Sequence, residues 1–282
     1  MIRPPAVAGA FYEGREGPLR ASIANLMPDV SPAPAFGAIV PHAGYVYSGG
    51  VAASVYARLA VSKTVVIVSP NHTGRGAPAA LDSSDAWRTP LGDVPVDARL
   101  SRRMRELSPS LVSDRTAHLR EHSLEVQLPF LQVLRPDVSL VPICLGAPDL
   151  DLCREIGEAF ARLREEEADG TEERNELPLL LASSDMNHYE SRDVGSRKDD
   201  RALARVEAID PEGLFATVLS ESISMCGFLP VTALLFAARA AGAAPAEVIA
   251  RSDSGDETGD TSSVVGYAGV VIGRPAREWK AP

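Results

Sequence analysis

The fold is best approached from the stretch Ala38-Ile-Val-Pro-His-Ala-Gly-Tyr-Val-Tyr-Ser-Gly-Gly50, in which a strand, a polar turn and a helix follow one another. Its apolar start predicts a buried strand, which Pro41 ends because proline has no N–H for the sheet ladder. His42 therefore stands where the strand stops, and the glycines after it allow a tight turn and close approach to a ligand. A helix is expected from Val51. In open parallel sheets, ligands bind at such strand ends.

Composition narrows the class of protein. The 282 residues are 45% hydrophobic, enough for a sizeable core, and their net charge of −10 disfavours nucleic acid as a partner. No apolar run reaches the roughly 20 residues of a membrane span. The start Met1-Ile-Arg-Pro-Pro5 lacks the apolar core of a signal peptide, so we expect a cytoplasmic protein with no membrane partner.

The plan of the opening stretch recurs along the chain. A β-branched run from Thr64 predicts a central strand, buried on both faces, that ends in Pro70-Asn71-His72. The alternation of strands and helices predicts one α/β domain over residues 1–282, with a mostly parallel central sheet flanked by helices. Further strands are expected at 138–146, 177–188, 246–252 and 264–272, and helices at 17–27, 50–61, 96–107, 123–134, 150–167, 199–209, 212–220 and 227–241.

Three segments carry more specific expectations. Pro129 lies inside the helical pattern of residues 123–134, and predicts a kink or a helix restarted at that point. Residues 165–176 are dense in acidic side chains and predict a mobile, solvated excursion. Asp253, Asp256 and Asp260 could bind a cation, but the turn that contains them is expected to be merely solvated.

Polar side chains with metal-binding or proton-transfer chemistry gather after the predicted strands. His42, His72 and His188 each follow a strand, so in a parallel sheet their imidazoles are expected to converge, and Asp185 lies three residues before His188. Cys226 precedes a predicted helix, whose N-terminus favours the thiolate that binds metal.

Several functions are compatible with this set. Two histidines and an anionic third ligand suit non-haem Fe(II), and a thiolate also fits zinc or copper. His188 or His122 would then shuttle protons, and Tyr45 and Tyr47 would close the pocket.

Each residue type also has a purely structural interpretation. A histidine after a strand is often an ordinary loop residue, and Cys226 alone is more often a small core residue than a ligand. Glu121, His122 and Glu125 could serve only to cap and salt-bridge a helix start. The other two cysteines, Cys144 and Cys153, are expected to pack in the interior.

Motifs along the whole chain, in unbroken order, resemble the Memo family, also named the B protein of the AmmeMemoRadiSam system. The matching pieces are Arg3-Pro-Pro-Ala-Val-Ala-Gly-Ala-Phe-Tyr12, Pro41-His-Ala-Gly-Tyr-Val-Tyr-Ser-Gly49, Pro70-Asn-His72, Glu121-His-Ser-Leu-Glu-Val-Gln-Leu-Pro-Phe130, Ser183-Ser-Asp-Met-Asn-His-Tyr189, Met225-Cys-Gly227 and Ser262-Ser-Val-Val-Gly-Tyr-Ala268.

The resemblance implies a fold like that of the class III extradiol (LigB-type) dioxygenases, in which two His and one Glu hold Fe(II). His42 and His72 match the two His ligands, and Cys226 stands where those enzymes have the carboxylate. His188 matches their acid–base histidine, and Asp185 belongs to the same pocket. The change from Glu to Cys, typical of the Memo branch, puts ring cleavage in doubt because a thiolate alters the redox behaviour of iron and is itself oxidisable.

By the same resemblance, the expected cofactor is Fe(II), with copper or zinc as alternatives, and the expected pocket also contains Glu121 and Tyr189. The system name implies an AMMECR-type protein and a radical-SAM enzyme as partners. The leading hypothesis is a metalloprotein with a dioxygenase-like pocket, acting as an iron-dependent oxidoreductase if it is catalytic.

Two rivals stay open. In the first, a vestigial pocket captures a small molecule, a peptide or a partner protein, with Tyr45, Tyr47, Tyr189 and Trp87 as contact surface. In the second, Cys226 is a nucleophile that attacks a carbonyl, activated by His188 or His72.

Overall fold

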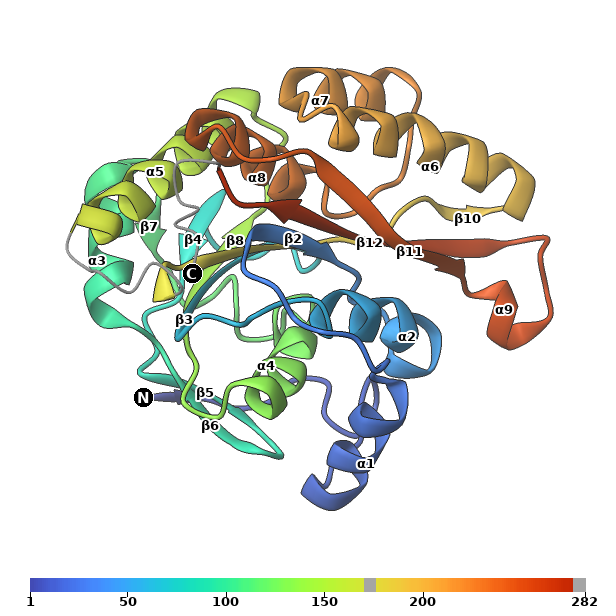
Figure 1. Ribbon diagram of the computed structural model, residues 1–282, viewed down its shortest axis with the longest axis horizontal. Coiled ribbons are helices and arrows are strands. Elements are labelled where there is room, and N and C mark those ends of the chain that lie inside the picture. The colour runs from blue at the N-terminus through green and yellow to red at the C-terminus, as the bar shows by residue number, and fades with distance from the viewer. Residues whose placement is uncertain (170–175, 276–282) are drawn as a thin grey trace.

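A sheet of nine strands runs through the middle of the molecule, in the order β10-β12-β2-β9-β3-β8-β4-β7, with β11 beside β12 (Figure 1). A separate small sheet joins β1, β5 and β6. The structure is a computed structural model, which describes residues 1–169 and 176–275. Among the described residues, no helix has both the length and the apolar character that crossing a membrane requires.

The bounds of the elements are as follows. The strands are β1 (Ile2–Arg3), β2 (Ala35–Val40), β3 (Thr64–Pro70), β4 (Ala79–Leu81), β5 (Ala86–Thr89), β6 (Gly92–Pro95), β7 (Val112–Ser113), β8 (Ser139–Leu145), β9 (Leu179–Ser183), β10 (His188–Glu190), β11 (Ala246–Asp253) and β12 (Val264–Gly273). The helices are α1 (Glu16–Leu26), α2 (Tyr45–Tyr56), α3 (Ala98–Leu107), α4 (Leu128–Leu134), α5 (Leu150–Asp169), α6 (Arg192–Glu207), α7 (Pro211–Ser220), α8 (Phe228–Ala241), α9 (Gly255–Thr258) and the 3₁₀ turn η1 (Glu125–Gln127).

The centre of the sheet is parallel, as the sequence predicts. β2, β9, β3 and β8 pair in parallel, so their carboxyl ends meet at one edge. The flanking pairs β12–β2 and β8–β4 are antiparallel. The three strands that precede His42, Asp185 and His72 are therefore neighbours, in the order β2-β9-β3.

Both faces of the sheet are covered by helices, which produces two hydrophobic cores. The α5–α8 core lies on one face, with α3, α6 and α7, and the α2–α4 core lies on the other, with α1. In β3, Val66 and Val68 contribute to the first core and Val65 and Ile67 to the second. This alternation is the two-residue period of a strand, and explains why the whole run is apolar.

Some segments differ from the sequence expectation. α2 begins at Tyr45, so Gly49 and Gly50 lie inside the helix and not in the turn before it. α6 begins at Arg192, one and a half to two turns earlier than predicted. The helix restarted near Pro129 is confirmed, because η1 passes directly into α4 with this proline in its first turn.

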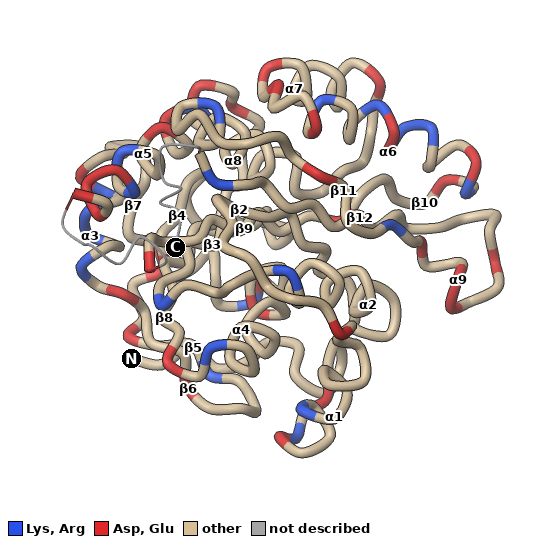
Figure 2. Tube along the Cα trace, in the orientation of Figure 1, with Lys and Arg blue, Asp and Glu red and all other residues tan. Residues whose placement is uncertain are grey.

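The acidic stretch 165–176 is not a single excursion. Residues up to Asp169 continue helix α5, where Arg103 pairs with Glu166 and Arg99 with Glu167. Residues 170–175 lie outside the described residues. Figure 2 shows that charged residues lie mainly along the outer helices, while the central strands contain few of them.

Candidate metal centre

Three strand ends and the loop before α8 surround one cavity of about 820 Å³. His42 follows β2, His72 follows β3, and Asp185 follows β9, while Cys226 approaches from the other side in the loop before α8. The imidazole centroids of His42 and His72 are 5.2 Å apart. The predicted convergence of strand ends therefore holds for His42 and His72. The strand predicted over 177–188 ends earlier, at Ser183, and His188 begins the separate strand β10, although it still lines the cavity.

The donor atoms of His42, His72 and Cys226 all lie within 4.8 Å of one another. The closest pair is Nε2 of His42 and Sγ of Cys226, at 3.1 Å. The side chain of His42 is buried. Burial is the main cause, and the two neighbouring histidines the second, that hold its pKa well below the usual value, so its ring is neutral. A neutral imidazole is the form that binds a metal ion.

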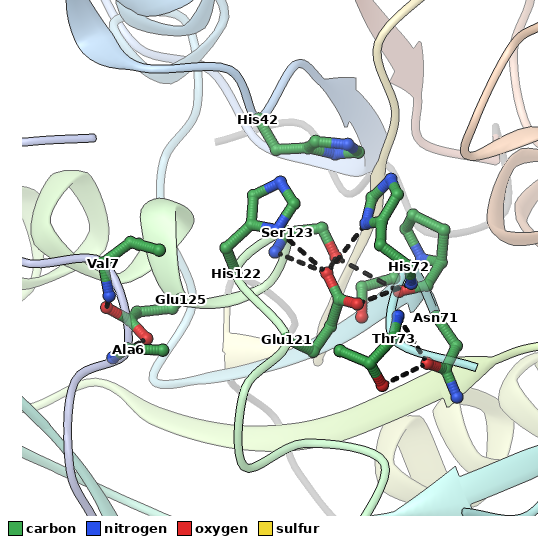
Figure 3. Close-up of polar contacts among 12 residues, drawn as sticks. Ala6, Val7, His42, Asn71, His72, Thr73, Glu121, His122, Ser123 and Glu125 are labelled. Carbon is green, nitrogen blue, oxygen red and sulfur yellow. Dashed lines mark hydrogen bonds and ion pairs between the residues drawn. The ribbon is translucent and has the colours of Figure 1, made fainter. Parts of the chain in front are cut away.

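Glu121 orients the second imidazole. Its Oε1 accepts a hydrogen bond from Nδ1 of His72 at 2.9 Å, and its Oε2 accepts one from the His72 backbone N–H at 2.6 Å. Burial alone would raise the pKa of Glu121, but the bonds from His72 and Ser123 lower it to about 2. Because an ionised carboxylate can only accept, Nδ1 of His72 carries a proton, and in the neutral ring Nε2 is the bare nitrogen. Burial lowers the pKa of His72, but the hydrogen bond and charge of Glu121 outweigh it and raise this pKa above its usual value, so binding of a metal at Nε2 competes with protonation of the ring. Figure 3 shows Glu121 joined to His72, with the rings of His42 and His122 above it and nearly perpendicular to each other.

Asp185 connects the first histidine to the cysteine. Its Oδ1 accepts from the backbone N–H of His42 at 2.7 Å, and its own N–H donates to Sγ of Cys226 at 3.3 Å. Burial raises the pKa of Asp185 above its usual value, although the hydrogen bond from the His42 backbone N–H lowers it by less.

The expected thiolate at Cys226 needs a correction. Burial, with the Asp185 carboxylate second, raises the pKa of the Cys226 thiol well above its usual value. Hydrogen bonds from the backbone N–H groups of Asp185 and Gly227 lower it by less. Desolvation therefore outweighs the helix end, and without a bound cation the sulfur is protonated.

His188 and His122 complete the polar wall. Nδ1 of His188 donates to the carbonyl oxygen of Ser224 at 2.9 Å, and this histidine forms a donor group with Asp185 and Cys226 within 4.8 Å. The ring of His122 stacks on His72, with centroids 4.8 Å apart. Burial lowers the pKa of His122, so it too is neutral.

The rim of the cavity is more apolar. Tyr47 and Tyr189 lie there as predicted, with side chains 41% and 78% exposed, beside the 64% exposed Val46. The backbone of Tyr189 has a φ of 60°, a conformation that costs a non-glycine residue energy and often marks a functional site. Phe11, from the N-terminal segment, lines the cavity and packs on His122.

Two predicted contact residues lie elsewhere. Tyr45 does not line the cavity, because its hydroxyl donates to the carbonyl of Val126 and its ring packs on Phe130 inside the α2–α4 core. Trp87 is fully buried and donates to Asp82, so it offers no contact surface. Both have a fixed polar partner, which lets an aromatic hydroxyl or indole be buried.

The structural interpretations hold elsewhere. Cys144 and Cys153 are buried in strand and helix, as expected. Asp253 and Asp256 both pair with Arg192, which occupies the place that a cation would take in that turn. Glu125 is buried against Arg3 and has no place in the cavity lining.

Sequence reasoning missed Phe11, Val46 and Tyr267 as lining residues, and Gln127 as a polar support. Phe11 lies far from the strand ends in the sequence. A glutamine inside an apolar helical pattern, at residue 127, was the signal that a buried polar contact was required there.

Fold and site together define an α/β protein with a candidate two-histidine, one-cysteine metal centre at the carboxyl edge of a parallel sheet. The sequence model of the Memo-like protein family matches residues 3–271, so the chain belongs to the Memo family.

Relatives match over nearly their whole length. A MEMO1 family protein of Methanopyrus kandleri is 40% identical, over 97% of this chain and 100% of the relative. One of Aeropyrum pernix is 42% identical, over 96% and 99%. The crystal structure of an uncharacterized protein of Escherichia coli K12 shares the fold, with a TM-score of 0.51 and 16% identity, over 74% of this chain and 86% of that one.

The residues present fit a transition-metal ion. Two imidazole nitrogens and one sulfur form a compact donor set, and the cavity leaves room for further ligands beside them. The carboxylate–histidine contact of Glu121 and His72 is the outer support that metal-binding histidines usually have.

Proposed function

We propose that this Memo-family protein binds one iron ion, or copper in its place, through His42, His72 and Cys226, and acts in a redox or oxygen-dependent step. The observation that carries the proposal is the convergence of these three donors within 4.8 Å at the wall of a large open cavity. A bound iron or copper ion would supply one-electron redox chemistry and Lewis acidity. Zinc fits the same donors but would supply only the second.

The surrounding residues support an acid–base role beside such an ion. His188 donates through Nδ1 to a backbone carbonyl, so in the neutral ring Nε2 is free to accept a proton from a ligand in the cavity. Asp185 accepts a hydrogen bond from the His42 backbone and belongs, with His188 and Cys226, to a second set of close donor atoms. The exposed apolar rim would hold the organic part of a small ligand.

The resemblance to class III extradiol dioxygenases supports an oxygen-dependent reaction, and sulfur in place of a carboxylate ligand weighs against ring cleavage itself. We include in the proposal a cytoplasmic location and an association with an AMMECR-type protein and a radical-SAM enzyme, as the family's system name implies.

Metal content tests the proposal. Protein purified without air should contain about one iron or copper per chain, and a nitric oxide probe should bind to an Fe(II)-loaded sample. Cys226→Ser and His72→Ala should each lose most of the metal while keeping the circular dichroism of the parent. Cys153→Ser, which removes a buried thiol that does not line the cavity, is the matched control and should retain the metal. Unchanged metal in both site variants would overturn the proposal.

The exposed rim of Val46, Tyr47 and Tyr189 favours one second candidate, a module that binds a peptide without catalysis. Metal-free protein would then bind such a peptide equally well with and without His188→Ala. Binding that requires the metal, or is lost with His188→Ala, would exclude this candidate.

A further inference from the structure

A chain of buried polar groups supports His42 from behind the cavity. It runs from the Tyr56 hydroxyl in α2 through the Gln127 side chain at the end of η1 to Ser183 at the end of β9. Ser183 Oγ lies 2.9 Å from Nδ1 of His42. All four side chains are almost completely buried, so water does not compete for these bonds.

The chemistry of the partners fixes the direction of each bond. The Pro41 carbonyl can only accept, so the group of Gln127 that faces it at 3.0 Å is the amide nitrogen. The second hydrogen of that amide points to Ser183 Oγ at 2.9 Å, and its oxygen accepts from Tyr56 at 2.8 Å. Both hydrogens of the Gln127 side-chain amide are thus used.

Ser183 has one proton, and it is committed elsewhere. Its hydroxyl donates to the carbonyl of Ser123 at 2.6 Å, which can only accept. Since Gln127 donates to the same oxygen, the remaining lone pair of Ser183 can only accept from His42. Nδ1 of His42 must therefore carry the proton, and in the neutral ring Nε2 is the bare nitrogen, the atom that lies 3.1 Å from Cys226 Sγ.

We propose that Ser183 and Gln127 are positioning residues, which hold His42 in the single tautomer that presents Nε2 to the metal. The part of this inference that concerns the metal rests on the proposed function. The tautomer itself does not, because the hydrogen bonds that fix it exist in the metal-free protein. The neutral Ser183 hydroxyl thus does for His42 what the Glu121 carboxylate does for His72: each accepts a hydrogen bond from Nδ1 of the imidazole. Ser123 joins both supports, because its carbonyl faces Ser183 and its N–H and hydroxyl donate to Glu121.

The tautomer is read directly by long-range ¹H–¹⁵N NMR of the histidine side chains in metal-free protein. Parent protein should show His42 with a protonated Nδ1. Ser183→Ala removes the acceptor, and should shift a measurable population to the Nε2-protonated form. Gln127→Met should do so to a smaller degree, because without the bond from Gln127 the Ser183 hydroxyl can leave the Ser123 carbonyl and donate to His42 instead. Gln132→Met, another buried glutamine with hydrogen bonds of its own, is the control and should leave His42 unchanged.

The second readout is the dissociation constant for Fe(II), measured by competition with a chelator. Loss of such outer support typically weakens metal binding 10- to 100-fold, so we expect about that for Ser183→Ala and no change for Gln132→Met. If Ser183→Ala does not fold, Gln127→Met decides the question with the same two measurements. A parent His42 protonated at Nε2, or a tautomer that neither variant shifts, overturns the inference. A shifted tautomer in a protein that binds neither iron nor copper supports the inference and overturns the proposed function instead.

Discussion

Asp199 is a buried carboxyl outside the candidate metal centre, and its ionisation opposes folding. It packs against Gly266 of β12 and accepts a bond from the backbone N–H of Asn187 at 2.9 Å. Burial raises its pKa from 3.8 to about 6, because the effect of burial is larger than the lowering by that hydrogen bond. The folded protein therefore holds this proton more tightly than the unfolded chain, and the associated stability is complete below pH 4 and is lost as the pH rises through 6.

Asp199→Asn removes the ionisation and keeps the acceptor oxygen. We expect the variant to be more stable than the parent at pH 8, by up to about 3 kcal/mol for a shift of this size, and to differ little at pH 4. Urea unfolding at both pH values measures this. The exposed neighbour Asp200, substituted in the same way, should show no such rise. A constant difference between parent and Asp199→Asn across pH would contradict the prediction.

Two glycines in helices have opposite surroundings. At Gly50, on the exposed side of α2, an added Cβ meets no atom within 4 Å. At Gly157 in α5, it would lie 2.4 Å from the carbonyl oxygen of Ala233 in α8, where the two helices pack closely. Gly50 therefore lowers the stability of its helix without any packing need, whereas Gly157 is required because a larger residue would not fit between the two helices.

Gly50→Ala should therefore raise the free energy of unfolding by about 0.5–1 kcal/mol, the usual difference between the two residues inside a helix. Gly157→Ala should lower it, because the backbones of α5 and α8 must separate. Thermal and urea melts of the two variants provide the comparison. Destabilisation by Gly50→Ala would show that α2 does not extend through residue 50.

The N-terminal segment is fastened to the loop that carries Glu121 by one buried ion pair. Arg3 donates to Glu125 and to the backbone carbonyls of His118 and Glu121. Glu125 in turn accepts from the backbone of residues 6 and 7 and from the Tyr12 hydroxyl. Both charges are fully buried, and the guanidinium lies 3.9 Å over the Trp87 ring.

Arg3→Met should destabilise the protein by about 3–5 kcal/mol, because it leaves a buried carboxylate without its counter-charge. Equilibrium denaturation measures the loss. Arg88→Met, which breaks a salt bridge at the surface, is the control and should change the midpoint little. Equal losses of stability in Arg3→Met and Arg88→Met would contradict the claim that the buried ion pair matters more than the exposed one.

Local patterns explain which parts of this element structure the sequence could predict. The β-branched run before His72 and the apolar run before His42 identify strands, and parallel strand ends meet at one edge, so these two histidines and Asp185 could be placed together. The start of α2 could not be predicted, because Gly49 and Gly50 disfavour a helix locally and packing overrides that preference. The Arg3–Glu125 pair and the inward position of Tyr45 depend on contacts between distant segments, which leave no local pattern.

At the scale of the molecule, the two cores share every central strand. In β9, Leu180 and Ala182 belong to the α5–α8 core, while Leu179 and Leu181 belong to the α2–α4 core. Neither core can lose its strands while the other remains intact. The described chain should therefore unfold as one unit.

Urea unfolding tests this cooperativity. Trp87 is buried in the α2–α4 core, and its fluorescence should change together with the far-ultraviolet circular dichroism, to which the long helices of the other core contribute most. Substitution of Trp279, outside the described residues, by Phe leaves Trp87 as the single reporter. Two separated transitions would show that the faces are independent.

The order in the sequence of the three candidate metal donors, His42, His72 and Cys226, also has a consequence for how the protein is made. The ribosome releases His42 and His72 early, while Cys226 emerges only after more than half of the chain has followed them. A nascent chain therefore exposes two imidazoles for a long period without the sulfur that completes the set. Under the proposed function, a metal ion would therefore meet the full set of donors late, after most strands of the sheet have been synthesised.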